Sequence, residues 1–390
     1  MSTASMNAAS RDESAIQSVA IGRVPALDGV RGLAILIVLI HNVSWVRQSS
    51  SWLPLKLVAA VTATGWIGVQ LFFVLSGFLI TSILLATRTS RHYLRNFYVR
   101  RALRIFPLYY GVLVPVLLIG PWFGTAAWSA AVHENQWWLW TFTSNWGGPL
   151  GRGVPGLPHF WSLAVEEQFY LVWPFLVLAT SRRGLIMVCI ATLLATPFIR
   201  IGLLAAGLPV DTAYEFTIAR WDALAGGALV ALLVTTESGS TWLAKWLPRA
   251  GTGSSVAIAL FAAVTHGFHQ DEFWAQVVGQ SLTVVAFAWL VYAAFAPRTG
   301  IERALCDGLT SRWLRFLGKY SYAIYVFHAP FHQIASTYVG SFVTGADTPW
   351  RLLRWALYVA SIGAASIAAA LCSWHVLEKR FLGLKDRFTR

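Results

Sequence analysis

The fold class that the sequence predicts is all-α: a polytopic bundle of about ten transmembrane helices. Of the 390 residues, 56% are hydrophobic and only 12% are charged, whereas a soluble domain carries about 25% charged residues. Apolar runs of about 20 residues, enough to cross a bilayer core of about 30 Å, recur along the chain. Twenty tryptophans also suit a protein with two membrane–water interfaces. The net charge of +13 could indicate nucleic acid, but nucleic-acid-binding proteins are rarely this hydrophobic, so no such partner is expected.

Reading the apolar runs against the flanking arginines and lysines places ten spans in order. They cover residues 32–50, 60–86, 105–122, 160–179, 184–205, 217–235, 252–267, 274–296, 316–339 and 351–374. With the N-terminus inside, the pieces that face the cytoplasm are 1–31, 87–104, 180–183, 236–251, 297–315 and 375–390. These pieces hold most of the basic residues, as the positive-inside rule requires, and both termini are then cytoplasmic.

The tryptophan-rich run 126–143 is the candidate for an eleventh span. Counting it would move Arg182 and Arg183 to the outside, against the positive-inside rule. Residues 123–159 are therefore expected to form an extracytoplasmic loop with room for a re-entrant or interfacial helix. The expected organisation is a cytoplasmic tail over 1–26, one transmembrane domain over 27–380 and a second cytoplasmic tail over 381–390.

The three cysteines predict neither a disulfide framework nor a metal site. Cys189, Cys306 and Cys372 are odd in number and widely spaced, and each lies in or beside an apolar stretch. Cysteines in such surroundings act as small hydrophobic side chains. No metal ligands are therefore expected in this chain.

Four segments carry polar or ionisable residues into the expected spans, where an ionised side chain costs about 2.5–3.5 kcal/mol to insert. They are 27–32 together with His41 and Asn42, 161–170, 220–222 and 320–328. Counting about 1.5 Å per helical residue places His41, His328 and Glu166 at neighbouring depths within the bilayer, with Arg220 near its outer boundary. A polar column across the membrane is expected. The alternative is that each side chain satisfies a separate hydrogen bond between helices.

The expected inner loop 87–104 is unusually rich in arginine. Its six arginines, without lysine or acid, are Arg88, Arg91, Arg95, Arg100, Arg101 and Arg104. Arginine is the side chain suited to bidentate contact with phosphate, so the loop predicts a polyphosphorylated cytosolic ligand. The alternative is an orientation signal that contacts anionic lipid.

Six segments, taken in order, resemble a known family. They are Leu27–Gly32 with His41, Gly65–Ile80, Arg101–Pro107, Trp161–Tyr170, Arg220–Gly227 and Ser321–His328. Over residues 27–380 the chain resembles acyltransferase family 3, the bacterial integral-membrane enzymes that O-acylate surface polysaccharides and related glycans. One such motif would be weak evidence, whereas the ordered set is strong.

The resemblance implies transfer of an acyl group, usually acetyl, from acetyl-CoA at the cytoplasmic face to a glycan hydroxyl outside. It implies an enzyme of the bacterial cytoplasmic (inner) membrane with no tightly bound cofactor. Its partners would be the lipid bilayer, acyl-CoA and a lipid-linked or polymeric glycan, such as lipopolysaccharide O-antigen or exopolysaccharide. Two alternatives stay open. One is an acyltransferase for a small acceptor such as a macrolide or a lipid, and the other is a glycan or lipid-linked sugar transporter with buried charges along its path.

The resemblance also assigns roles to residues at matching positions. His41 would be the catalytic histidine, Arg31 its basic partner and Glu166 the acid of the Trp-Ser-Leu segment. A neutral histidine suits a general base, and an acetyl relay on His41 is equally compatible with the sequence. The residues expected to bind the phosphates of CoA are Arg100, Arg101 and Arg104. The residues expected to line the acceptor route or support the site are Asp28, Tyr170, Arg220, Asp222, Tyr325 and His328.

Two positions depart from the family pattern. Nine residues separate Arg31 from His41 where the family has ten, and ten steps of about 100° leave them about 80° apart on a straight helix. Their direct contact therefore needs an irregular helix or one that begins after Arg31. Near the C-terminus, Glu378 is followed by Lys379 where many members have proline. Ser76, in an apolar Ser-Gly pair, is interpreted as a packing residue or helix break rather than a nucleophile.

Overall fold

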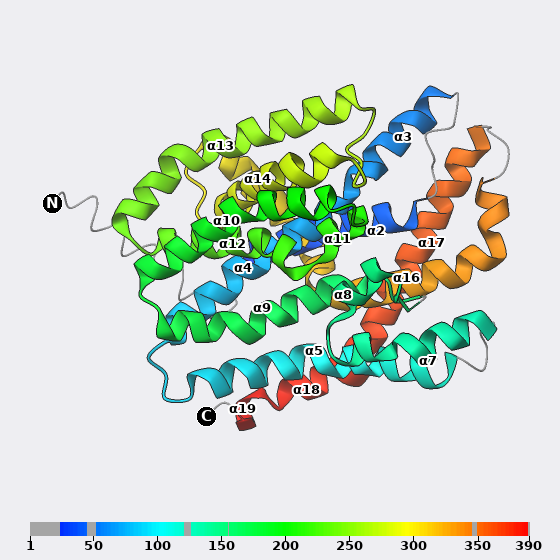
Figure 1. Ribbon diagram of the computed structural model, residues 1–390, viewed down its shortest axis with the longest axis horizontal. Helices are drawn as coiled ribbons and strands as arrows, with labels where there is room; N and C mark the ends of the chain where they lie inside the picture. The colour runs from blue at the N-terminus through cyan, green and yellow to red at the C-terminus, as the bar shows by residue number, and fades with distance from the viewer. Residues whose placement is uncertain (1–23, 45–51, 121–125, 155, 345–348, 389–390) are drawn as a thin grey trace.

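The computed structural model describes residues 24–44, 52–120, 126–154, 156–344 and 349–388, and within these ranges it contains helices and no strand (Figure 1). The all-α prediction is confirmed. In chain order the elements are α2 (Pro25–Val43), α3 (Leu53–Ala63), η1 (Thr64–Trp66), α4 (Ile67–Thr87), α5 (Tyr93–Leu118), α7 (Ala126–Trp140), α8 (Ser144–Gly147), η2 (Gly148–Leu150), α9 (Phe160–Ala179), α10 (Arg182–Ala205), α11 (Val210–Glu215), η3 (Thr217–Ala219), α12 (Trp221–Val234), α13 (Glu237–Val264), η4 (Ala275–Gly279), α14 (Gln280–Phe295), α15 (Gly300–Leu309), α16 (Arg312–Thr344), α17 (Pro349–Ser373), η5 (Trp374–Glu378), α18 (Lys379–Gly383) and α19 (Lys385–Phe388).

Eight helical stretches in the described part of the chain are long and apolar enough to cross a membrane, so the protein is a multi-pass membrane protein. They are Pro25–Val43, Leu53–Thr87, Tyr93–Leu118, Phe160–Ala179, Arg182–Ala205, Glu237–Val264, Ala275–Phe295 and Trp350–Gly383. Each matches one of the ten expected spans. The other two expected spans, 217–235 and 316–339, correspond to α12, an apolar helix of 14 residues, and to α16, a helix of 33 residues outside the eight.

Several segments that were expected to be loops are helical. Residues 93–104 form the first three turns of α5, 237–251 form the first half of α13, and α15 lies within 297–315. An apolar run marks only the part of a helix that meets hydrocarbon, whereas the helix itself continues because Arg, Lys, Glu and Ala are good helix formers. Within 123–159 the 15-residue helix α7 is too short to count among the eight stretches. Residues 1–23, 45–51, 121–125 and 389–390 of the expected tails, spans and loop lie outside the described residues.

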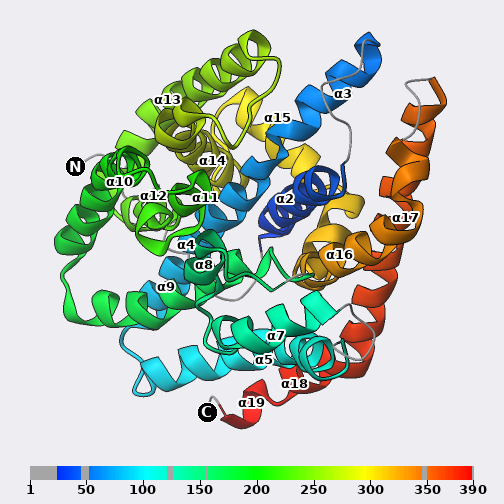
Figure 2. The same ribbon diagram turned by 45° about the vertical axis from the view of Figure 1, so that its right-hand side comes forward.

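Several of the long helices, among them α5, α9, α10 and α13, run roughly lengthwise in Figure 1, whereas α17 is steeply inclined to them. The α4–α5, α9–α10 and α12–α13 turns lie at the same end as α19, on the left in Figure 1, whereas α3, α7 and α8 lie toward the right. Figure 2 shows α2 and α4 surrounded by the other helices. Burial agrees with this arrangement, since 67% of the most apolar window of Leu53–Thr87 is buried, against 17% for the peripheral α13.

Glycines allow the two central helices to touch their neighbours at backbone distance. A Cβ atom added to Gly32 of α2 would lie 1.9 Å from the carbonyl oxygen of Leu314, and one added to Gly77 of α4 would lie 1.9 Å from that of Leu224. Small residues at such crossings are the usual basis of close helix packing in membranes. The contacts hold α2 against α16 and α4 against α12, and so fix the walls between which the polar residues lie.

Candidate active site

A cavity of about 500 Å³ lies between α2, α4, α5, α9 and α16, and α19 also contributes to its wall. On α4 the lining residues run from Val69 to Thr87, so the cavity extends along about 27 Å of this helix. Because α4 lies along the long direction of the bundle (Figure 1), the cavity is a deep, narrow space parallel to the helices. Such a shape suits an extended ligand that enters from one end.

One end of the cavity, here called the basic end, is defined by five cationic side chains. They are Arg31, Arg100, Arg101, Arg104 and Lys385. Arg101 and Arg104 are three residues apart on α5 and therefore share a face of that helix. The guanidinium of Arg101 lies 5.3 Å from the ring centroid of Tyr170, and Arg31 Nη1 lies 2.8 Å from Asp28 Oδ1. Asp28 pairs with Arg31, and the arginines gathered at this end favour a polyanion, because guanidinium groups are suited to bidentate contact with phosphate.

The opposite end, here called the neutral end, carries no charged side chain among its described lining residues. It is defined by Val69, Phe72, Phe73, Ser162, Leu163 and Tyr325. Between the two ends, Ser76 Oγ donates a hydrogen bond of 2.7 Å to Glu166 Oε1, and α4 continues as a regular helix through this serine. Ser76 is therefore a hydrogen-bonding residue of the cavity wall rather than a helix break.

Two acceptor atoms in the cavity wall are buried and lack a hydrogen-bond partner among the described residues. They are Asn96 Oδ1 and Glu167 Oε1, and both residues line the cavity. An unsatisfied buried acceptor costs about 1–3 kcal/mol. A ligand that offers N–H or O–H groups along the cavity would remove this cost.

His41 lies beyond the neutral end and does not line the cavity. Its Nδ1 is 2.7 Å from the carbonyl oxygen of Thr62. A carbonyl can only accept, so Nδ1 carries the proton and Nε2 keeps its lone pair. Gly65 of η1 packs on this ring, since a Cβ added there would lie 2.6 Å from His41 Cβ. The chain thus holds a neutral imidazole in one tautomer, with its basic nitrogen available.

A chain of polar contacts connects the residue beside His41 to the cavity wall. Asn42 Nδ2 lies 2.9 Å from His328 Nε2, and His328 Nδ1 lies 2.6 Å from the carbonyl oxygen of Tyr325. The ring of His159 is 5.0 Å from that of His328. Burial and the neighbouring His328 lower the pKa of His159 well below its usual value, so this ring is neutral. His328 is therefore linked to the residue beside His41, and Tyr325 belongs to both this chain of contacts and the cavity wall.

The structure separates Arg31 from His41. Helix α2 is continuous from Pro25 to Val43, so it neither begins after Arg31 nor contains an irregular turn. Ten residues at about 1.5 Å each place the two side chains about 15 Å apart along the helix. The expected pairing is not formed, because a straight helix cannot fold one residue back on the other; Arg31 binds Asp28 in the cavity instead.

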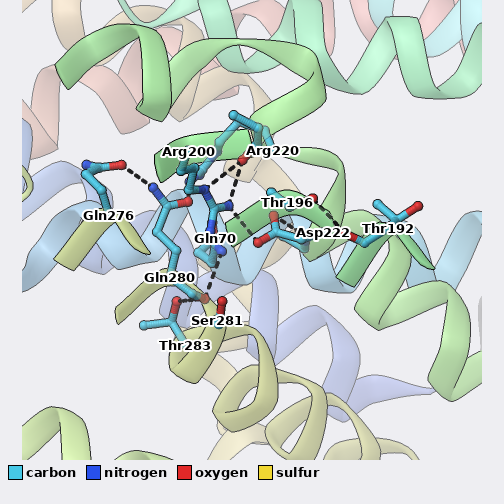
Figure 3. A network of polar contacts seen from close by, with 12 residues as sticks. Gln70, Thr192, Thr196, Arg200, Arg220, Asp222, Gln276, Gln280, Ser281 and Thr283 are labelled. Atoms are coloured by element: carbon cyan, nitrogen blue, oxygen red, sulfur yellow. Dashed lines mark hydrogen bonds and ion pairs between the residues drawn. The ribbon is translucent and has the colours of Figure 1, made fainter. Parts of the chain in front are cut away.

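Arg220 and Asp222 belong to a buried network and not to a cavity wall (Figure 3). Asp222 Oδ2 forms an ion pair of 2.6 Å with Arg200 Nη2, and both side chains are almost fully buried. Arg220 donates to Gln280 Oε1, and its guanidinium lies 4.6 Å from the ring centroid of Tyr214. Neither residue lines the cavity described above, so the expectation that they line the acceptor route or support the site stays a prediction.

The residues of the predicted polar column lie in two different places, and so do the arginines of 87–104. His41 lies with His328, whereas Glu166 lies in the cavity. Of the six arginines of 87–104, only Arg100, Arg101 and Arg104 line the cavity in the described structure. Arg88 instead donates to the carbonyl oxygens of Leu178 and Thr180 at the end of α9. A helical α5 explains the division, because arginines spread around a helix cannot all face one side.

Sequence reasoning missed several residues that the structure places at the site. They are Thr62, Gly65, Asn96, His159, Glu167 and Lys385. His159 lies two residues before the Trp-Ser-Leu segment, and Gly65 begins another motif, so both had a local signal. A backbone carbonyl such as that of Thr62 leaves no mark in the sequence.

Comparison with known proteins identifies related chains. A family described as "Acyltransferase domain" matches residues 24–374. The peptidoglycan O-acetyltransferase OatA of Listeria monocytogenes is 29% identical over 334 residues, which cover 79% of this chain and 49% of that protein. The O-acetyltransferase OatA of Staphylococcus aureus is 27% identical over 334 residues, covering 81% and 51%. The chain thus spans about half the length of these curated relatives. No solved structure matches the chain.

Proposed function

Because this chain belongs to acyltransferase family 3, a family of membrane acyltransferases that includes O-acetyltransferases, we propose that it transfers an acetyl group from cytosolic acetyl-CoA to a hydroxyl of a cell-surface glycan. The observation that carries this proposal is the division of one cavity into a basic end and a neutral end. CoA has the same division, with phosphates on its nucleotide and an uncharged arm that ends in the thioester. No other described feature of the chain has this match in charge and length.

The donor binds with its phosphates at the basic end. Arg101 and Arg104 share a face of α5, so both guanidinium groups can donate to the phosphates. Such charge-assisted hydrogen bonds are shorter and stronger than bonds between neutral groups. Arg31 contributes from α2, so its role is donor binding and not contact with His41. The amide N–H groups of the arm supply a donor for the unpartnered oxygen of Glu167, which lies on α9 between Tyr170 and the neutral end. The thioester then lies toward the neutral end, near Glu166 or beyond it.

The basic end faces the cytoplasm in this proposal. Arg88 and Arg91, at the α4–α5 turn, and Arg182 and Arg183, at the start of α10, lie at the same end of the bundle as α19 (Figure 1). The positive-inside rule assigns that end to the cytoplasm of a bacterial inner membrane. With α12 and α16 also crossing, the bundle has ten spans and both termini inside. Lys385 lines the cavity, so the catalytic domain extends through α19 rather than ending at residue 380.

His41 Nε2 is the general base in a direct transfer. It removes the proton of the acceptor hydroxyl, the hydroxyl oxygen forms a bond to the thioester carbon, and the CoA thiolate leaves and takes up a proton. In a relay, Nε2 itself bonds to the thioester carbon while the C–S bond breaks and the CoA thiolate leaves. The acceptor hydroxyl oxygen then bonds to that carbon, the C–Nε2 bond breaks, and the hydroxyl proton passes to Nε2 and on to the thiolate.

The acceptor is a hydroxyl of a cell-wall glycan. The two relatives described above are named for O-acetylation, one of them for peptidoglycan, so a peptidoglycan sugar is a better first candidate than O-antigen or exopolysaccharide. His41 lies two residues before the last residue of α2, at the end of this helix opposite the basic end. This position places the transfer step at the outer face, where such a glycan is exposed.

The proposal is tested by replacing His41 in the host bacterium. Acetate released from the purified cell-wall glycan, measured by mass spectrometry, should fall to background in His41→Ala. His133→Ala, which changes an exposed histidine of α7, is the matched control and should retain wild-type acetate. Wild-type acetate in a well-expressed His41→Ala strain would remove His41 from the chemistry.

A further inference from the structure

We propose that Tyr325, held by the start of α9, closes the neutral end of the cavity and limits the length of the acyl group that the enzyme transfers. This inference rests on the proposed function, since it places the thioester at the neutral end. It adds a specificity determinant for the donor. Tyr325, which the sequence analysis expected to line the acceptor route or support the site, would thereby contact the acyl group.

Two hydrogen bonds fix the Tyr325 ring across the end of the cavity. Its hydroxyl lies 2.6 Å from Ser162 Oγ and donates to the carbonyl oxygen of His159 at 2.9 Å. Both partners belong to the first turn of α9 and its preceding residue, so the ring is tied to a second helix. The ring of Phe72 meets that of Tyr325 edge to face, with centroids 6.3 Å apart. Both rings line the cavity, and together they form its end wall.

Aromatic rings pack behind this wall. The rings of His159 and His328 lie 5.2 Å and 5.4 Å from the Tyr325 ring on the side away from the cavity. Both histidines are buried. A longer acyl chain must therefore displace a packed aromatic layer, whereas an acetyl group adds only one methyl beyond the thioester carbonyl. This difference predicts strong preference for the shortest chain.

The distance from the cations is consistent with this assignment. Arg101 contacts the ring of Tyr170, which lies eight residues along α9 from Ser162. At about 1.5 Å per residue the wall is about 12 Å deeper than this cation. The intervening wall carries Leu163 and Glu166, with no further cation on α9. The uncharged arm of CoA fits this interval, and its acyl end reaches Tyr325.

The test is the ratio of kcat/KM for butyryl-CoA to that for acetyl-CoA in purified protein. Each buried methylene contributes about 0.8 kcal/mol. A variant whose cavity accommodates the two extra methylenes of butyryl-CoA should therefore raise this ratio by about 15-fold. Tyr325→Ala and Phe72→Ala should each give this rise. Tyr325→Phe keeps the ring and should give a much smaller one. Leu79→Ala, a cavity residue about 10 Å from Phe72 on α4, should leave the ratio at the wild-type value whatever its effect on the rate.

The outcomes separate this inference from the proposed function. An unchanged ratio in both Tyr325→Ala and Phe72→Ala, or an equal rise in Leu79→Ala, overturns the role of the wall. If a variant is inactive, the ratio of dissociation constants for butyryl-CoA and acetyl-CoA is measured instead, and the same rise is expected. The proposed function itself is refuted if the wild-type protein binds neither butyryl-CoA nor acetyl-CoA. Measurements on the variants cannot give that result.

Discussion

Gly65→Ala tests whether the fixed position of His41 matters for catalysis. The new methyl carbon would lie 2.6 Å from His41 Cβ and 3.0 Å from the carbonyl oxygen of Ile37. Carbon atoms pack at about 3.5–4.0 Å, so η1 and α2 must separate by about 1 Å. That movement stretches the 2.7 Å contact between His41 Nδ1 and Thr62 O beyond the range of a hydrogen bond. The imidazole then loses both its fixed tautomer and its position.

A displacement of about 1 Å at a reacting group costs about 100-fold in rate, so kcat for acetyl transfer to a glycan fragment should fall by that factor. Acetyl-CoA affinity should stay near wild type, because neither Gly65 nor His41 lines the cavity. The overpacking itself costs about 1–3 kcal/mol of stability, which a lowered Tm would report. The matched control is Gly253→Ala in α13, where a new methyl meets nothing within 4 Å.

The reasoning fails if Gly65→Ala keeps kcat within about threefold of wild type while the Tm falls. Such a result would mean that the clash is relieved without moving His41, or that His41 need not be held. An equal loss of acetyl-CoA affinity and kcat would also contradict it, because the displaced atoms lie outside the donor cavity.

Two further changes probe the donor site and the scaffold. Arg101→Ala and Arg104→Ala should each weaken acetyl-CoA binding about 10-fold or more, because a hydrogen bond to a charged group contributes about 1.5–3 kcal/mol. The control is Arg95→Ala, an exposed position of α5 that does not line the cavity, and it should leave the Kd for acetyl-CoA from calorimetric titration unchanged. If all three variants weaken binding equally, α5 attracts the donor only by its overall positive charge and the specific donor site is wrong. Arg200→Ala leaves the buried Asp222 carboxylate unpaired and should cost about 3–5 kcal/mol, seen as a large drop in Tm; an unchanged Tm would show that the ion pair does not stabilise the bundle.

The sequence predicts the membrane class and the order of the helices well, because both follow from composition and from apolar runs. Arg101, Arg104 and Glu166, which its motifs single out, all line one cavity. The pairing of Arg31 with His41 could be doubted from spacing alone, and the continuous α2 explains why it does not form. Arg200 also carried a signal, since it is a charge within an apolar run.

Other parts of the site depend on contacts between distant segments and have no local pattern. Ser76 and Glu166 are ninety residues apart and meet only when α4 packs beside α9. The Thr62 carbonyl that orients His41 comes from the end of α3, where η1 interrupts the helix. Such tertiary pairings need the coordinates, because neither propensity nor periodicity specifies which helix faces which.

The central claim is that donor binding and acyl transfer are carried by separate parts of the chain, the basic end of the cavity and His41. The most direct measurement determines acetyl-CoA affinity and acetyl transfer in the same purified samples of wild type, His41→Ala and Arg104→Ala. We expect His41→Ala to bind acetyl-CoA as wild type does and to transfer no acetyl group, and Arg104→Ala to bind weakly and to transfer once the donor is saturating. Transfer by His41→Ala at the wild-type rate, or unchanged affinity in Arg104→Ala, would contradict the account.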